Sequence, residues 1–121
     1  MDAGKAIILF GHGSRDPLWR QPLDAVAQRI RSEQPDLPVR CAFLELQSPD
    51  LAGAAAELAA AGARRITVVP MFLGTGRHAR EDLPLLLEQV RRDHPAITFD
   101  LQQPVGEDPR LLDLLAKIAL A

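Results

Sequence analysis

Apolar runs alternate with segments of helical periodicity along the 121 residues of the chain. Four short runs, residues 6–10, 39–46, 66–73 and 97–101, are largely apolar and rich in β-branched or aromatic side chains. The first and third are nearly continuous in apolar residues, which is typical of parallel strands that are covered on both faces. We therefore expect four strands, each followed by a helix.

The segments after these runs have the period of an amphipathic helix. In each, apolar residues recur at positions i, i+3, i+4 and i+7, which places them on one face of a helix. The four sets are Leu23, Val26, Ala27 and Ile30; Leu51, Ala54, Ala55 and Leu58; Leu83, Leu86, Leu87 and Val90; and Leu111, Leu114, Leu115 and Ile118. Each set predicts a helix with a single apolar stripe.

Capping signals agree with this division. A capping side chain followed by proline predicts three helix starts, at Asp16-Pro17, Ser48-Pro49 and Asp108-Pro109. Asp82-Leu83-Pro84 predicts the start of the third helix, Gly62 suits the left-handed position after the second, and Pro35 and Pro95 stop the first and third. Right-handed crossovers then give an α/β fold, a three-layer αβα sandwich on a four-stranded parallel sheet with the flavodoxin-like order 2-1-3-4.

Composition narrows the class of protein. The length predicts one domain over residues 1–121. No apolar run approaches the roughly 18 residues of a membrane span, the first ten residues lack the features of a secretory signal, and the single cysteine, Cys41, cannot form an internal disulfide. We therefore expect a cytoplasmic protein without a membrane partner. A net charge of -2 and an aromatic content of 4% argue against binding to nucleic acid.

Polar residues follow three of the predicted strands. His12 stands between two glycines after the first strand, Glu45 lies near the end of the second, and His78 lies on a glycine-containing loop after the third. In open α/β sheets the carboxyl ends of the strands form the ligand-binding edge. Imidazole with carboxylate suits cobalt, nickel, iron or zinc, and the same groups can accept protons near neutral pH.

Each of these residues also has an ordinary interpretation. A histidine in a loop is often a surface hydrogen-bonding group, and a glutamate can sit at a solvated strand end. His94 ends the third helix before Pro95, where it complements the helix C-terminus, so we assign it no role in the site. Cys41 is expected to be a small buried hydrophobe.

Basic residues are also placed near this edge. Arg15, Arg20, Arg77 and Arg80 could together bind the carboxylates of an anionic ligand. The alternative is a solvated charged face.

Four motifs, taken in this order and spacing, resemble the CbiX-type sirohydrochlorin chelatases along the whole chain. They are Phe10-Gly11-His12-Gly13-Ser14-Arg15; Phe43-Leu44-Glu45-Leu46 with Pro49; Pro70-Met71-Phe72-Leu73 with Gly76, His78 and Asp82-Leu83-Pro84; and Pro104-Val105-Gly106 with Pro109-Arg110-Leu111-Leu112.

The resemblance implies a class II chelatase fold and the insertion of a divalent metal, typically Co²⁺, into sirohydrochlorin. His12 and His78 would be the metal-site residues, and Glu45 would support or ligate the metal. The metal is a substrate here, and no prosthetic group is needed. Ser14, Arg15, Arg77 and Arg80 are the residues to which we assign contacts with the tetrapyrrole.

The resemblance also implies the small form of the family, which pairs as a homodimer. Members divide between cobalt and iron, so a sirohydrochlorin ferrochelatase is an alternative. The chain has only three histidines, which weakens an assignment to nickel because nickel-inserting relatives often carry a histidine-rich stretch.

Two other classes of function conflict with these residues, and a third stays open. A histidine phosphatase needs an arginine directly before the first histidine, and Gly11 stands there. A flavodoxin-like FMN module needs a phosphate loop rich in Ser and Thr, whereas residues 11–17 offer only Ser14. A non-enzymatic carrier of metal or tetrapyrrole stays open as an alternative.

Overall fold

Four strands form one parallel sheet in the order β2-β1-β3-β4. The computed structural model describes residues 3–121. The strands are β1 (Lys5–Gly11), β2 (Val39–Phe43), β3 (Arg65–Pro70) and β4 (Thr98–Leu101). Leu9 in the central strand lies opposite Cys41 on one side and Val69 on the other. The predicted strand order, with its crossover between β2 and β3, is confirmed.

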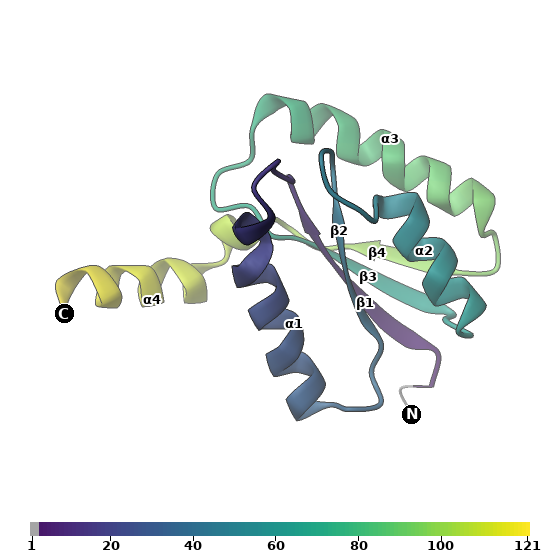
Figure 1. The fold of residues 1–121 in the computed structure, drawn as a ribbon, viewed down its shortest axis with the longest axis horizontal. Coiled ribbons are helices and arrows are strands. Elements are labelled where there is room, and N and C mark those ends of the chain that lie inside the picture. Colours follow the sequence, from purple (N-terminus) through teal and green to yellow (C-terminus); the bar gives the residue numbers. More distant parts are fainter. Residues whose placement is uncertain (1–2) are drawn as a thin grey trace.

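The helices follow the strands one by one (Figure 1). They are α1 (Gln21–Glu33), α2 (Leu51–Ala60), α3 (Arg77–Asp93) and α4 (Pro109–Leu120), with 3-10 turns η1 (Pro17–Arg20) and η2 (Val105–Glu107). One face of the sheet packs against α1, and the other packs against α2 and α3. Within residues 3–121, no helix is both long enough and apolar enough to cross a membrane.

Two apolar clusters hold these layers together. The larger lies between the sheet and helices α2 and α3, and its centre includes Ile8, Phe10 and Leu58, each with 0% of its surface exposed. The smaller lies between the sheet and α1 and contains Leu9 and Leu23. Successive residues of β1 thus enter opposite clusters, which explains why this strand reads as a continuous apolar run.

Strand ends differ from the prediction. The second and third strands stop at Phe43 and Pro70, before the predicted ends at residues 46 and 73. The Phe43 amide donates to the Pro49 carbonyl, so the chain folds back on itself over residues 44–49. Leu46 has a φ of 67°, a left-handed conformation that a strand does not contain. The strands were predicted too long because the loop residues that follow them are also apolar.

Two predicted helix starts are wrong. Helix α2 is capped by Asp50, whose carboxylate accepts a hydrogen bond from the Gly53 amide, and Ser48-Pro49 is a cis peptide ahead of it. Helix α3 begins at Arg77, so Pro84 lies inside it. Pro84 has no amide to donate to the Arg80 carbonyl, but both residues are exposed and water can bind that carbonyl.

The other predicted capping residues do cap or end an element in the structure. Asp16 accepts a hydrogen bond from the Leu18 amide, although the element it caps is the 3-10 turn η1 and α1 follows only at Gln21. Asp108 caps α4 as predicted, with Pro109 in its first turn. Gly62 follows α2 with a φ of 94°.

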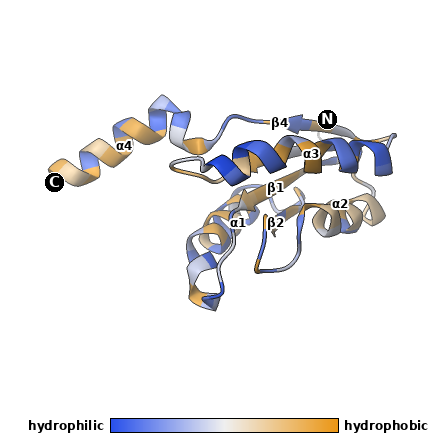
Figure 2. Cartoon of the chain, turned by 90° about the horizontal axis from the view of Figure 1, so that it is seen from above, coloured by the Kyte–Doolittle hydropathy of each residue, from blue (hydrophilic) through white to orange (hydrophobic). Residues whose placement is uncertain are grey.

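Helix α4 does not complete the outer layer. It leaves the body of the molecule beyond the edge at which the strands end (Figure 1), and its residues are exposed or half-buried. Apolar residues recur along its surface (Figure 2). The predicted three-layer αβα arrangement is confirmed, but three helices rather than four cover this chain's own sheet.

The core predicts a contrast between two leucine truncations. Leu58→Ala should lower the free energy of unfolding by about 2–5 kcal/mol, because a fully buried side chain leaves a cavity. Leu85→Ala, at a residue of α3 that is 62% exposed, should change it by no more than about 0.5 kcal/mol. Denaturant unfolding of both variants measures the difference, and equal losses would contradict the assigned core.

Candidate metal centre

Three side chains, from two loops and the first turn of α3, meet at the edge where β1, β2 and β3 end. Glu45 Oε1 lies 3.0 Å from His12 Nε2 and 3.9 Å from His78 Nδ1. The centroids of the two imidazole rings are 6.2 Å apart. The structure thus brings together the three residues that the sequence places at this edge.

Backbone pairing holds His12 beside Glu45. Beyond the end of β2, the Leu44 amide donates to the Gly11 carbonyl and the Glu45 amide donates to the His12 carbonyl, at 2.9 and 3.1 Å. The two segments therefore stay joined by backbone hydrogen bonds just beyond the end of the sheet. Gly13 then turns away with a φ of 99°, and a Cβ atom there would lie 1.7 Å from the Glu45 carbonyl oxygen. Only glycine permits this close approach.

His78 reaches the site from a helix. The predicted loop ends at Gly76, and His78 lies on the first turn of α3. The prediction that His78 lies on a loop is wrong, because α3 starts earlier than its proline suggests. A helical backbone holds this imidazole more firmly than a glycine-containing loop would.

Asp82 is a member of the site that the sequence analysis did not assign. It lies one helical turn after His78, and its Oδ2 is 2.6 Å from His78 Nε2. The imidazole of His78 therefore lies between two carboxylates, with Nε2 beside Asp82 and Nδ1 3.9 Å from Glu45 Oε1. The i, i+4 spacing of histidine and aspartate is the signal that could have identified it.

The geometry suits a divalent transition metal. One ligand atom from each of His12, Glu45 and His78 lies within 4.8 Å of the others. Their side chains are 41%, 40% and 54% exposed, so a bound ion would keep contact with solvent. Three protein donors leave coordination positions free for exchange, and mixed nitrogen and oxygen donors suit Co²⁺, Fe²⁺, Ni²⁺ or Zn²⁺.

The four arginines divide into two groups. Arg20 packs its guanidinium over the Phe43 ring, 4.6 Å from the centroid, and pairs with Asp24, a hydrogen bond that raises the pKa of Arg20. Its role is structural. Arg77 and Arg80 are exposed on the first turn of α3, where Arg77 pairs with Glu81 and Arg80 donates to the Thr75 carbonyl.

The first loop carries the two other residues assigned to substrate. Arg15 is exposed on it. The hydroxyl of Ser14 accepts a hydrogen bond from the Asp16 amide at 3.1 Å, so Ser14 also stabilises the turn into η1.

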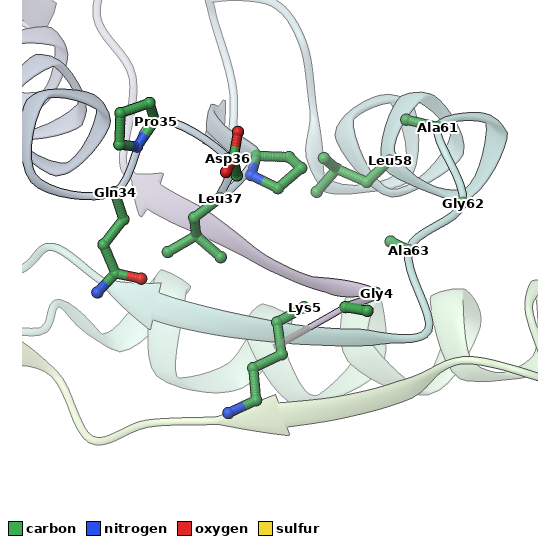
Figure 3. Close-up of a pocket in the computed structure, with 12 residues that line it drawn as sticks. Gly4, Lys5, Gln34, Pro35, Asp36, Leu37, Leu58, Ala61, Gly62 and Ala63 are labelled. Atoms are coloured by element: carbon green, nitrogen blue, oxygen red, sulfur yellow. The ribbon is translucent and has the colours of Figure 1, made fainter. Parts of the chain in front are cut away.

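A separate hollow of about 510 Å³ lies at the opposite edge of the sheet (Figure 3). Its lining includes Gly4, Lys5, Gln34, Asp36 and Leu37, near the start of β1 and the ends of α1 and α2. Histidine and cysteine are missing from its described lining, and backbone and apolar atoms supply much of its wall. The three residues of the candidate metal centre lie away from this hollow, on the carboxyl edge of the sheet.

The sequence and the fold are both similar to those of known proteins. The family model described as CbiX matches residues 6–119. A sirohydrochlorin cobaltochelatase of Methanopyrus kandleri is 29% identical, with 91% of each chain covered. The crystal structure of a cobalamin biosynthesis CbiX protein from Marinobacter aquaeolei VT8 is 30% identical with a TM-score of 0.77, covering 95% of this chain and 93% of that one.

A longer chain has the same fold in part of its length. The sirohydrochlorin chelatase SirB from Bacillus subtilis subspecies spizizenii, solved in complex with cobalt, is 30% identical with a TM-score of 0.78. The match covers 93% of this chain and 48% of SirB.

The contact at Gly13 predicts a second pair of variants. Gly13→Ala should lower the melting temperature strongly, because the new methyl group collides with the Glu45 carbonyl and the backbone conformation is strained. Gly76→Ala, where a Cβ atom meets nothing within 4 Å, serves as the control and should change it little. A stable, unperturbed Gly13→Ala protein would contradict the described contact between the loops.

The convergence of imidazoles predicts the effect on metal binding. His78→Ala and His12→Ala should each weaken Co²⁺ binding by at least about 10–100-fold while leaving the circular dichroism spectrum intact, because a donor is lost from a half-exposed site. His94→Ala, at the far end of α3, is the matched control. Calorimetric titration with Co²⁺ measures all three, and unchanged affinity in either site variant would contradict the centre.

Proposed function

The chain belongs to the CbiX family, and on this premise we propose that it inserts a divalent metal, with Co²⁺ as the first candidate, into sirohydrochlorin. The observation that carries the proposal is the meeting of His12, Glu45 and His78 at one edge of the sheet. The printed functions of the Methanopyrus kandleri protein and of SirB support the same reaction. We place the protein in the cytoplasm.

The reaction requires groups of this kind. The ring must lose two pyrrole protons, and the metal must exchange solvent ligands for ring nitrogens. Neutral imidazoles can hold the ion or take a proton, and Glu45 supplies a negatively charged donor beside both rings. His12 Nε2 can donate to Glu45, which then leaves His12 Nδ1 as an acceptor. The metal is a substrate that the site holds and passes on.

Basic residues give the substrate its orientation in this proposal. Sirohydrochlorin carries many carboxylates, and Arg77 and Arg80 lie within three residues of His78 on the first turn of α3. Arg15 extends the same charge along the first loop, and the Ser14 hydroxyl offers a further polar contact. Guanidinium groups bind carboxylates in a paired geometry, which fixes orientation as well as affinity.

A homodimer completes the site in the proposal. The carboxyl edge of one four-stranded sheet offers one wall, whereas a tetrapyrrole is a wide disc that needs walls on both sides. The match covers 48% of SirB, so two copies of the chain are together about as long as that chelatase. A twofold pair with facing edges would provide both walls from identical chains.

The test is anaerobic incubation of the protein with sirohydrochlorin and, in separate reactions, Co²⁺, Fe²⁺ and Ni²⁺, followed by absorbance. Insertion of Co²⁺ well above the uncatalysed rate supports the proposal. Faster insertion of Fe²⁺ would make the protein a ferrochelatase instead. Binding of both substrates without acceleration would favour the carrier and overturn the enzymatic assignment.

The proposed role of the arginines predicts that their loss changes KM more than kcat. Arg77→Gln and Arg15→Gln should raise KM for sirohydrochlorin more than they lower kcat, because they bind carboxylates remote from the ring centre. The effect should shrink at high salt, which screens exposed charges. Arg92→Gln, at the other end of α3, is the control. A loss confined to kcat would contradict this role.

A further inference from the structure

The loop after β2 contains a rare backbone conformation at Leu46. Its φ is 67°, and within residues 3–121 it is the only residue other than glycine with a positive φ. The Gln47 amide donates across it to the Glu45 carbonyl at 2.8 Å. A hydrogen bond between residues i and i+2 around a residue of positive φ forms the rare, strained type of γ-turn. Strain of this kind clusters at binding sites, where the surrounding structure holds it in place.

Neighbouring contacts hold this turn. The Glu45 amide donates to the His12 carbonyl at 3.1 Å, and the Glu45 carbonyl accepts the Gln47 amide. The same carbonyl lies against Gly13, where a Cβ atom would be 1.7 Å from its oxygen. The residue before Leu46 is thus fixed to the first loop, and the turn presents Leu46 in one conformation.

Neither the backbone nor the core explains why this residue is a leucine. The other described residues with a positive φ, at positions 4, 13 and 62, are all glycine, which adopts that conformation without strain. Leu46 is 55% exposed and belongs to neither apolar cluster, whereas Leu44 packs against the larger one. Glycine would therefore suit the turn better, and what leucine adds is an apolar surface in contact with solvent.

This apolar surface lies at the metal centre. Leu46 directly follows Glu45, whose carboxylate is 3.0 Å from His12 Nε2. Within residues 3–121 and outside α3 and α4, the exposed large apolar residues all lie where the four strands end or in the segments that follow them (Figure 1). They are Leu18 and Trp19 after β1, Leu46 after β2, Leu73 after β3 and Leu101 at the end of β4. Exposed apolar side chains gathered at one edge mark a binding surface.

We propose that Leu46 contacts the apolar face of the tetrapyrrole and positions the ring over the metal. This rests on the proposed function, which supplies sirohydrochlorin as the ring. A tetrapyrrole is apolar over its conjugated centre and carries its carboxylates at the periphery. The metal must reach the centre of the ring, so a residue beside the metal donors meets the face of the ring, whereas Arg77 and Arg80 can meet the peripheral carboxylates. A turn that is fixed before binding makes this contact without a cost for ordering the loop.

The first test compares apolar and polar side chains at this position. Leu46→Asn keeps the size of the side chain and tolerates a positive φ, whereas Leu46→Met keeps the apolar character. Leu46→Asn should weaken the binding of metal-free sirohydrochlorin roughly 10-fold in an absorbance titration, because an apolar contact is lost. Leu46→Met should bind like the unaltered protein.

Leu85→Asn is the matched control, because Leu85 is a leucine of α3 that is 62% exposed. It should bind the ring like the unaltered protein. Equal affinities of Leu46→Asn and the unaltered protein, or no binding of the ring by the unaltered protein, would overturn the proposal.

Salt separates this contact from those of the arginines. The loss of affinity in Leu46→Asn should persist in concentrated sodium chloride, because an apolar contact is not screened, whereas the loss in Arg77→Gln should shrink. A loss in Leu46→Asn that shrinks with salt to the same degree would indicate an effect on charge and would overturn the apolar contact.

Leu46→Gly tests the turn itself. This variant should keep or raise the denaturant midpoint, because glycine adopts a positive φ without strain, and it should weaken binding of the ring as Leu46→Asn does. Its Co²⁺ affinity without the ring should equal that of the unaltered protein. A lower midpoint or a weaker Co²⁺ affinity would show that Leu46 stabilises the loop or places Glu45, and either result would overturn the proposal.

The inference and the proposed function fail separately. Binding of the ring that depends on Leu46, without metal insertion, would leave the contact intact and remove the activity. Metal insertion by Leu46→Asn with an unchanged KM for sirohydrochlorin would do the reverse. A smaller mass of Leu46→Asn than of the unaltered protein, measured by light scattering, would assign the leucine to a contact between copies and overturn the contact with the ring.

Discussion

The site depends on how closely two loop backbones approach each other at Gly13. The hydrogen bond from the Glu45 amide to the His12 carbonyl extends the backbone pairing past the ends of β1 and β2. This extension brings the imidazole and the carboxylate together before any side-chain contact is made. A larger residue at position 13 would separate the loops, because the Glu45 carbonyl occupies the space of its Cβ atom. The proximity of the His12 and Glu45 side chains is therefore a consequence of how the two backbones pair.

The order of the strands brings the third side chain, His78, to the site. Because β3 pairs with β1 on the side opposite to β2, the loop after β3 delivers α3 to the same edge, and with it His78. The order β2-β1-β3 could be predicted from the alternation of apolar runs and helical stripes, since right-handed crossovers leave few arrangements. The proximity of His12, Glu45 and His78 then follows from topology, which is why positions 33 and 66 residues apart in sequence could be associated without coordinates.

Prolines and apolar runs predicted the ends of helices and strands less well where tertiary contacts decide those ends. Pro84 suggested a helix start, but α3 begins seven residues earlier. The helix tolerates this proline because the Arg80 carbonyl, which lacks an amide partner there, is exposed to water. Glu45 was expected inside a strand, whereas residues 44–49 fold back through the bond between Phe43 and Pro49. Arg20 belongs to a charge cluster in the sequence, yet its guanidinium covers an aromatic ring. The stripe of α4 was read correctly, but periodicity does not say which surface a stripe will meet.

The solvent exposure of the three metal donors affects how fast a bound ion can leave. Each side chain keeps two fifths or more of its surface in contact with solvent, and the set has too few ligands to enclose an ion. Storage proteins and structural zinc sites surround their metal and release it slowly. A site that hands its ion to a ring in every cycle has the opposite requirement, since a long residence time would itself limit turnover. Shallow placement at the end of a sheet, with water able to replace each ligand in turn, favours rapid transfer over tight retention.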